Sequence, residues 1–332
     1  MNKFIVITTI NNKSEAIKKY DNLKDWNLIV IGDSKTPNIN LKNGIYLNLK
    51  NQKQLNFSCI KKIPYNTYSR INIGYLLALK NKADIIASVD DDNIPLSNWG
   101  KNVFVNSKTD SNFIFSKNKF IDILFHHKYV SKKNIWHRGF PLEDLNLRKY
   151  QKSIFKQKKH IEVQAGLWNV EPDVDAVCRI SNGPYNLKFK DKKFIIDNKA
   201  YSPFNTQNTI FSKRIIPGMC LMFGVGRMLD IFSSFVCQRI MRELGSYTLF
   251  TGPTVKQIRN EHNLKNDLID EITGIKNFKL FTRTLDQTKL KKKDNVPEMF
   301  AKISKSISEL EFISKDNIKY QSHWIDDTSK FF

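Results

Sequence analysis

The sequence predicts an α/β fold with a mostly parallel sheet, because strand-like runs alternate with helix-like runs over the first hundred residues. Phe4–Ile10 is typical of a buried strand, and Asp84–Val89 is another, which ends directly in three aspartates. Between them, Arg70–Lys80 carries apolar residues at helical spacing. Ligands of such sheets bind at the carboxyl ends of strands, so the sequence predicts a binding site there.

The other elements of this region follow from similar patterns. Ser14 is placed to cap a helix that continues to Leu23. Leu28–Asp33 is an apolar strand that ends in an acidic residue, and Ile45–Leu49 is a short third strand. Because Asp33 and the three later aspartates all stand at strand ends, topology predicts that they share one crevice.

The rest of the chain is less regular until a series of predicted helices. Arg227–Leu244 is typical of a long helix, and Ala301–Ser314 is the clearest amphipathic segment near the C-terminal end. The basic segment Lys289–Asp294 is predicted to connect two helices. No internal repeat and no Gly/Ser-rich linker divides the chain, which favours one catalytic domain with a helical extension.

The net charge predicts an anionic partner. The 332 residues include 54 Lys+Arg and 32 Asp+Glu, which gives +22, while 41% hydrophobic residues exclude a disordered basic tail. Nucleic acid, an acidic membrane surface and a phosphorylated small molecule all fit, and so does the bias of an AT-rich genome. No RNP, KH, zinc-finger or helix-turn-helix signature is present, so we do not expect a nucleic-acid partner.

Cysteine usage and apolar runs predict a cytoplasmic protein. The four cysteines are widely spaced and form no CxxC pair, which favours free thiols in a reducing compartment. The N-terminal apolar run is too short for a signal peptide. Pro217, Arg227 and Asp230 interrupt the longest apolar stretch, so no transmembrane segment is expected. The charge leaves peripheral contact with an acidic membrane open.

The three consecutive aspartates predict a divalent-cation site. Like charges repel one another and burial penalises each carboxylate, and a bound cation offsets both effects. Mg²⁺ or Mn²⁺ takes oxygen ligands, so Asp90 and Asp92 can share one ion while Asp91 stays available for a ribose or sugar hydroxyl. This Asp-x-Asp arrangement is typical of nucleotide-sugar transferases. A solvated acidic turn is the alternative.

Five segments of uncommon sequence carry a resemblance to a known family. They are WHRGFPLEDL (Trp136–Leu145), AGLWNVEPDVDAVCRI (Ala165–Ile180), SPFNTQNTIF (Ser202–Phe211), GRMLDIFSSFVCQRIMRELG (Gly226–Gly245) and RNEHNLKNDLIDEI (Arg259–Ile272). Together they resemble the STELLO glycosyltransferases and, more distantly, the reversibly glycosylated polypeptides, also called UDP-arabinopyranose mutases. The resemblance implies a GT-A-type nucleotide-diphospho-sugar transferase fold, a Rossmann-like mixed sheet flanked by helices, over residues 1–275. Residues 1–100 would bind the nucleotide sugar, residues 101–275 the acceptor, and residues 276–332 would form the helical extension.

The resemblance also implies roles for polar residues near the predicted crevice. Those expected to contact the donor are Thr8, Thr9 and Asp33 at the nucleoside, Arg70, Arg138 and Arg227 at the diphosphate, and Asp173, Asp175, Gln207 and Asn208 at sugar hydroxyls. Each also has a plain structural interpretation, as strand, turn, cap or loop residue.

Two further roles follow from the resemblance. Asp230, early in a predicted helix, matches the catalytic base of inverting enzymes, although the helix dipole alone favours a carboxylate there. His262 matches the late histidine that completes the metal site, and the alternative is an exposed or structural histidine.

These observations predict a metal-dependent glycosyltransferase. It would move a sugar from a nucleoside-diphosphate donor, with UDP favoured, to a hydroxyl of a glycan, lipid or protein acceptor. A nucleotide-sugar mutase is the first alternative, and a basic nucleic-acid-binding protein is an alternative of a different class.

Overall fold

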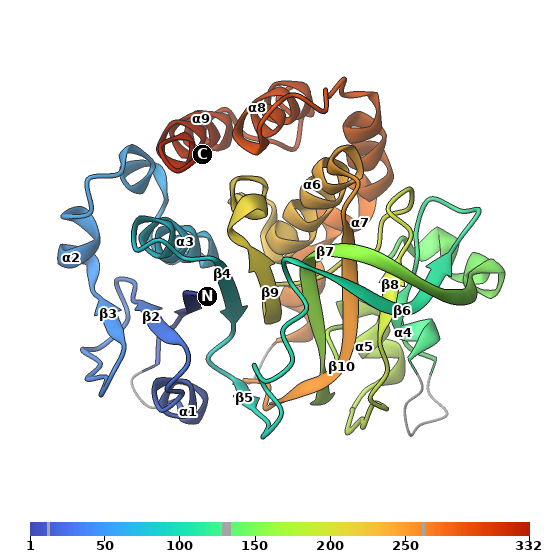
Figure 1. Cartoon of the computed structure of the whole chain (residues 1–332), viewed down its shortest axis with the longest axis horizontal. Helices are drawn as coiled ribbons and strands as arrows, with labels where there is room; N and C mark the ends of the chain where they lie inside the picture. The colour runs from blue at the N-terminus through green and yellow to red at the C-terminus, as the bar shows by residue number, and fades with distance from the viewer. Residues whose placement is uncertain (12–13, 128–133, 261–262) are drawn as a thin grey trace.

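The computed structural model describes residues 1–332 except 12–13, 128–133 and 261–262 (Figure 1). It is a mixed α/β structure in which ten strands of the described residues form one sheet, in the order β3-β2-β1-β4-β9-β7-β6-β8-β10-β5. Helices flank this sheet, as predicted. One hydrophobic cluster extends from the first strand to the last helix, so both ends of the chain belong to the same core.

The first four strands of the sheet form a parallel block, as the sequence predicts. They are β3 (Ile45–Leu47), β2 (Asn27–Ile31), β1 (Lys3–Thr8) and β4 (Ile85–Val89). Every residue of β4 is buried, which explains its continuous apolar sequence. Helix α3 (Ile71–Lys80) packs so closely on β1 that a Cβ at Gly74 would lie 2.2 Å from Cγ1 of Val6.

The remainder of the sheet is mixed, so the prediction of a mostly parallel sheet holds only for this block. The other strands are β9 (Asn208–Ser212), β7 (Lys152–Val170), β6 (Ser107–Phe115), β8 (Phe194–Ile196), β10 (Tyr247–Gln257) and β5 (Asn93–Pro95). β9 runs antiparallel to both β4 and β7, and β6 runs antiparallel to β7. The alternation of strands with helices stops after β4, and beyond it antiparallel pairs are mixed with the parallel pairs β7–β10 and β6–β8.

Three helices begin and end near the predicted residues, whereas the predicted amphipathic segment Ala301–Ser314 covers the second half of one helix and the turn that leads to the next. The remaining α-helices are α1 (Glu15–Asp21), α2 (Leu49–Lys53), α4 (Ile123–His126), α5 (Ala176–Asn182), α6 (Leu229–Leu244), α7 (Leu264–Gln287), α8 (Val296–Ile307) and α9 (Lys315–Ser329). Short 3-10 turns are η1 (Ser58–Lys62), η2 (Tyr68–Arg70), η3 (Leu142–Tyr150), η4 (Lys213–Met219) and η5 (Gly226–Met228). Ser14 caps α1 by accepting a hydrogen bond from the amide of Ile17, which confirms that prediction.

Helix α9 packs against the turn η1 in the first half of the chain. The predicted connector lies between α7 and α8, whereas the predicted boundary at residue 275 falls inside α7. From α9, Asp327 accepts a hydrogen bond from the amide of Cys59 at 2.8 Å, and the Tyr320 hydroxyl meets Asn72 at 2.6 Å. Among the described residues, no helix is long and apolar enough to cross a membrane.

Candidate nucleotide-sugar site

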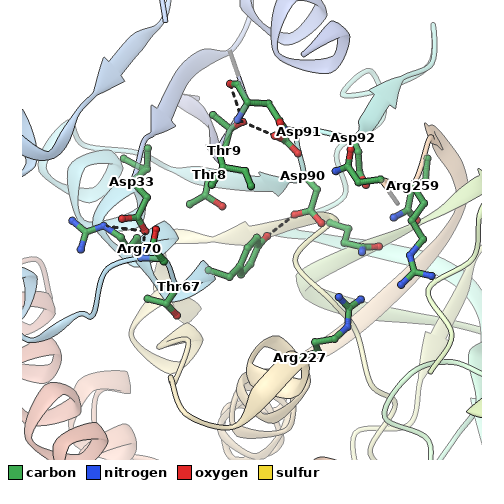
Figure 2. Close-up of a pocket in the computed structure, with 18 of the residues that line it drawn as sticks. Thr8, Thr9, Asp33, Thr67, Arg70, Asp90, Asp91, Asp92, Arg227 and Arg259 are labelled. Atoms are coloured by element: carbon green, nitrogen blue, oxygen red, sulfur yellow. Dashed lines mark hydrogen bonds and ion pairs between the residues drawn. The ribbon is translucent and has the colours of Figure 1, made fainter. Parts of the chain in front are cut away.

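A cavity of about 420 Å³ lies at the carboxyl ends of β1, β2 and β4 (Figure 2). Its opposite side is formed by η5 and by the segments that follow β7 and β10. Of the predicted site residues, those that line it are Thr8, Thr9, Asp33, Arg70, Asp90, Asp91, Asp92, Asp173, Gln207 and Arg227. The structure therefore brings most of the predicted residues together in one place.

Asp90 lies at the centre of the cavity, directly after β4. The Tyr68 hydroxyl donates a hydrogen bond to its Oδ1 at 2.6 Å and lies 3.1 Å from the Thr206 hydroxyl (Figure 2). Burial and the neighbouring Asp92 raise the pKa of Asp90 well above its usual range. A carboxylate with these surroundings gains strongly from a nearby positive charge.

Asp91 and Asp92 diverge from Asp90. Asp91 points toward the end of β1, where it accepts hydrogen bonds from the Thr9 hydroxyl and from the side-chain amide of Asn11, the latter at 2.9 Å. Burial and Asp91 raise the pKa of Asp92 to about 6. Oδ1 of Asp92 is buried without a hydrogen-bond partner in the described part of the chain. These three residues, Asp90–Asp92, are called the acidic wall below.

The acidic wall offers a divalent cation an incomplete ligand set. Within the described residues, no group of three or more His, Cys, Asp or Glu side chains is arranged to hold a metal ion. His262, the predicted third ligand, lies outside the described residues. Mg²⁺ commonly binds one or two carboxylates and completes its shell with substrate phosphates and water. Asp90 and the unpartnered oxygen of Asp92 fit that mode of binding.

The end of the cavity near β2 is organised by Asp33. Its carboxylate accepts hydrogen bonds from the backbone amides of Ser34 and Asn66, both at 2.7 Å. Nε of Arg70 lies 3.8 Å from it, while the other guanidinium nitrogens donate to Gln52 and to the carbonyl of Ile63. Arg70 is 3% exposed, so it orients Asp33 from behind and does not extend to the cavity centre.

Three arginines form the opposite side of the cavity, and only Arg227 among them is a predicted site residue. Arg179, Arg227 and Arg259, called the arginine wall below, all line the cavity. Burial and the repulsion of the other two arginines lower the pKa of Arg259. Three mutually repelling cations beside a cavity are suited to an anion. Arg179 and Arg259 lie within the segments that carry the family resemblance, so those segments could have identified both residues as candidates.

Acidic side chains behind the arginine wall hold it in place. Asp267 lies 3.2 Å from Nη1 of Arg227 and 2.6 Å from Nη2 of Arg259. Glu271 lies 3.4 Å from Nε of Arg227, and Glu171 pairs with Arg179. The guanidinium groups are thus oriented before any ligand arrives.

Arg138 and Asp230 form a buried ion pair in place of the predicted ligand contacts. The Arg138 guanidinium donates to both carboxylate oxygens of Asp230, at 2.9 and 2.8 Å, and to both of Asp173, at 2.8 and 3.1 Å. Only Asp173 lines the cavity. Because Arg138 occupies both oxygens of Asp230, the predicted role of Asp230 as a base stays a prediction that this geometry does not favour. Arg138 is not placed to reach a diphosphate.

The environment of Asp173 keeps it ionised at the cavity surface. Burial would raise its pKa, but the ion pair with Arg138 prevails and lowers the pKa to about 2. The side-chain amide of Asn205 also donates to Asp173, at 2.6 Å. Asp173 is therefore a fixed negative charge on the same side of the cavity as the arginine wall.

Asp175 and Asn208 do not line the cavity, contrary to their predicted donor contacts. Asp175 caps α5 by accepting from the amide of Cys178 and also accepts from the Trp136 indole, and burial raises its pKa to about 7. Asn208 is the first residue of β9, and its buried side chain does not line the cavity. The side chain links β9 to the carbonyl of Leu167 at 3.0 Å.

Comparison with known proteins identifies the family of the chain. The model of the family described as reversibly glycosylated polypeptide matches residues 2–329, nearly the whole chain. The chain belongs to the reversibly glycosylated polypeptide family. This confirms the resemblance, and the match extends through α8 and α9, beyond the predicted limit at residue 275.

Two proteins of Arabidopsis thaliana resemble this member of the reversibly glycosylated polypeptide family. One, named probable glycosyltransferase STELLO2, is 28% identical over 271 residues, which are 76% of this chain and 35% of the relative. The other, named probable glycosyltransferase STELLO1, is 25% identical over 347 aligned residues, 98% of this chain and 44% of the relative. The chain spans less than half the length of either relative.

Proposed function

We propose that the protein is a glycosyltransferase that uses a nucleoside-diphosphate sugar, with a GT-A-type arrangement of its site. The observation that carries the proposal is one cavity with the acidic wall on one side and the arginine wall on the other. The names of the two relatives support the same reaction class. The cavity volume of about 420 Å³ also falls within the range of small-molecule sites.

Each part of the donor would meet a different part of the cavity. The nucleoside would lie near Thr8 and Asp33, at the carboxyl ends of β1 and β2. UDP is the favoured nucleotide. The diphosphate would lie between the acidic wall and the arginine wall, where Arg227 and Arg259 would donate charge-assisted hydrogen bonds to it. The sugar would then lie beside Asp173 and Gln207.

Asp90 and Asp92 would hold a Mg²⁺ or Mn²⁺ ion. When bound, such an ion neutralises charge that develops on the departing diphosphate. Side chains of the protein would position the ligands of this ion. Tyr68 orients Asp90 by its hydrogen bond, and Thr9 holds Asp91 toward β1, where it can accept from a ribose hydroxyl.

Calorimetric titration tests the proposal. We expect UDP-glucose to bind in the presence of Mn²⁺ or Mg²⁺ and to bind at least about tenfold more weakly after chelation. Asp92→Asn should abolish this metal dependence, because it replaces the carboxylate whose Oδ1 lacks a partner. Asp84→Asn is the matched control, since Asp84 adjoins the other end of β4 and is half-exposed. Equal donor affinity in Asp92→Asn and the wild type, with and without metal, would contradict the metal site.

A nucleotide-sugar mutase is the second candidate, and the family match over residues 2–329 favours it. A mutase interconverts ring forms of its nucleotide sugar and needs no acceptor. Incubation with a UDP-pentose alone, followed by chromatography, separates the two functions. An isomeric UDP-sugar would indicate the mutase, whereas slow hydrolysis or an unchanged donor would favour the transferase.

A further inference from the structure

The proposed site does not explain the positive charge of the protein. The cationic side chains that line the cavity are Lys35, Arg70, Arg179, Arg227 and Arg259. The carboxylates that line it are Asp33, Asp90, Asp91, Asp92 and Asp173. The two sets cancel, so the whole excess of +22 lies outside the cavity.

A concentrated part of that excess lies on the β6–β7 pair. Residues 149–160 contain five lysines and no carboxylate, and we call this segment together with β6 the basic ribbon. Figure 1 shows β6 and β7 on the opposite side of the molecule from β2 and β3. The lysines are Lys149, Lys152, Lys156, Lys158 and Lys159, and none of them has an ion pair with any residue that the structure describes.

Strand register places three exposed lysines on one face of the basic ribbon. Lys156 and Lys158 pair with Asn112 and Asp110, respectively, and Lys108 lies two residues before Asp110 on β6. Side chains of directly paired residues, and of residues two apart on one strand, share a face of the sheet, and all five of these residues are exposed. The face therefore carries three lysines against a single carboxylate. Lys159 instead packs over the ring of Tyr247, on the other face.

A β-bulge adds an exposed aromatic side chain to this basic surface. Ile154 pairs with Phe113 and Lys156 pairs with Asn112, so Phe155 is an extra residue without a partner on β6. Its side chain is 88% exposed, the largest exposed fraction of any large hydrophobic residue that the structure describes. Tyr150, at 55%, lies near the start of the same segment. Isolated aromatics this exposed contribute nothing to the core.

We propose that the basic ribbon docks the protein on an anionic lipid bilayer. Lysines near an anionic membrane surface are attracted to its negative potential. An aromatic ring at the same level gains by leaving water for the interface. The two contributions act together on one surface, which suits a bilayer.

The chemistry of the basic ribbon favours a bilayer over nucleic acid. All five cations of the segment are lysines, which act as point charges, whereas bidentate recognition of individual phosphates relies on arginine. Arg148, next to the segment, is buried and donates to Asp122 at 3.0 Å. The proposal does not depend on the proposed enzymatic function, because the basic ribbon contains none of the residues that line the cavity.

Vesicle co-sedimentation tests the proposal. We expect the full chain to bind phosphatidylcholine vesicles with about 30% phosphatidylserine at about 0.15 M salt, and not pure phosphatidylcholine vesicles. The triple variant Lys108→Gln, Lys156→Gln, Lys158→Gln should bind about tenfold more weakly or worse. The matched control Lys291→Gln, Lys292→Gln, Lys293→Gln removes the same charge from the connector between α7 and α8 and should bind within about twofold of the wild type. An equal loss in both triple variants would overturn the proposal, because only net charge would matter.

The aromatic residue provides a second readout. Phe155→Trp should shift its emission to the blue when anionic vesicles are added, and Phe155→Ala should weaken vesicle binding several-fold. Phe332→Ala, at another exposed aromatic, is the control and should leave binding unchanged. No emission shift, or tighter binding to single-stranded RNA than to vesicles at equal salt, would overturn the bilayer as the partner.

Discussion

The two sides of the cavity are built in different ways. The acidic wall comes from one strand end, and its supports, Thr9 and Tyr68, belong to the adjacent strand and to the turn before α3. The arginine wall is assembled from α5, η5 and the segment after β10, which are distant in sequence. The first side follows from a local βα pattern, whereas the second depends on buried ion pairs between distant segments.

This difference predicts which substitutions affect folding and which affect binding. Burial and mutual repulsion raise the pKa values of Asp90 and Asp92, so their ionised forms oppose folding and favour a cationic ligand. The charges behind the arginine wall compensate one another, so each member contributes to the stability of the fold. Substitutions of the acidic wall and substitutions that break the buried ion pairs behind the arginine wall should therefore have opposite effects on stability.

Arg138→Met should have the largest effect. It leaves Asp173 and Asp230 buried without their shared partner, and breaking such a pair typically costs about 3–5 kcal/mol of folding free energy. Urea unfolding of the purified variant measures this loss. Adding Asp173→Asn and Asp230→Asn to Arg138→Met removes the unpaired charges and should recover part of the stability. A loss below about 1 kcal/mol in Arg138→Met would show that the ion pairs are not what holds this side together.

The sequence could predict the acidic wall but not these ion pairs. Asp33 and Asp90–Asp92 each follow a buried strand, and parallel strands bring their carboxyl ends to one edge. Nothing in the spacing of Arg138 and Asp230, 92 residues apart, indicates that they meet. Their polar character suggested ligand contacts, but in the folded chain they satisfy each other. The same holds for Asp175, whose sequence context hides its role as a helix cap.

The pH dependence of stability should have opposite signs on the two sides, with an effect of up to about 3 kcal/mol. The pKa of Asp92 is raised to about 6, so its proton is held more tightly in the folded state than in the unfolded chain. Its stabilising contribution is present at low pH and is lost as pH rises from about 4 to about 6. The pKa of Asp173 is lowered to about 2, so its contribution is present above about pH 4 and is lost as pH falls toward 2.

Unfolding curves at a series of pH values, recorded with a chelator present, separate the two contributions. Asp92→Asn should become more stable relative to the wild type between about pH 4 and pH 6. Asp173→Asn should instead be less stable than the wild type above about pH 4, and this difference in stability should disappear as pH falls to about 2. Parallel curves for the wild type and Asp92→Asn would mean that Asp92 titrates normally in the folded protein.

Arg259→Gln should weaken donor binding by about tenfold with little loss of stability, since a charge-assisted hydrogen bond contributes about 1.5–3 kcal/mol. Asp267, the partner of Arg259, keeps its ion pair with Arg227 in this variant, so no buried charge is left alone. Calorimetric titration with UDP and Mn²⁺ measures the change. Arg283→Gln, on the exposed side of α7, is the matched control. If both variants bind UDP equally well, the arginine wall does not contact the diphosphate.

The smallest predicted effect concerns the C-terminal helices, which support the acidic side from a distance. Asp327 is fully buried and accepts hydrogen bonds from the Cys59 amide and the Ser58 hydroxyl, in the turn η1 that precedes Tyr68. Asp327→Ala should cost about 1–3 kcal/mol, because it leaves a buried amide without an acceptor. Asp326→Ala, at the exposed neighbour, should cost less than about 0.5 kcal/mol.

Donor affinity in the Asp327→Ala variant shows whether α9 affects the cavity as well as the stability of the fold. Tyr68 lies on a separate turn and bonds directly to Asp90, so folded Asp327→Ala should bind UDP with nearly wild-type affinity. The loss should then appear only as a lower urea midpoint. A tenfold weaker affinity in the folded variant would instead mean that α9 orients the acidic wall through η1 and η2. In that case the acidic wall, like the arginine wall, would depend on segments that are distant in sequence.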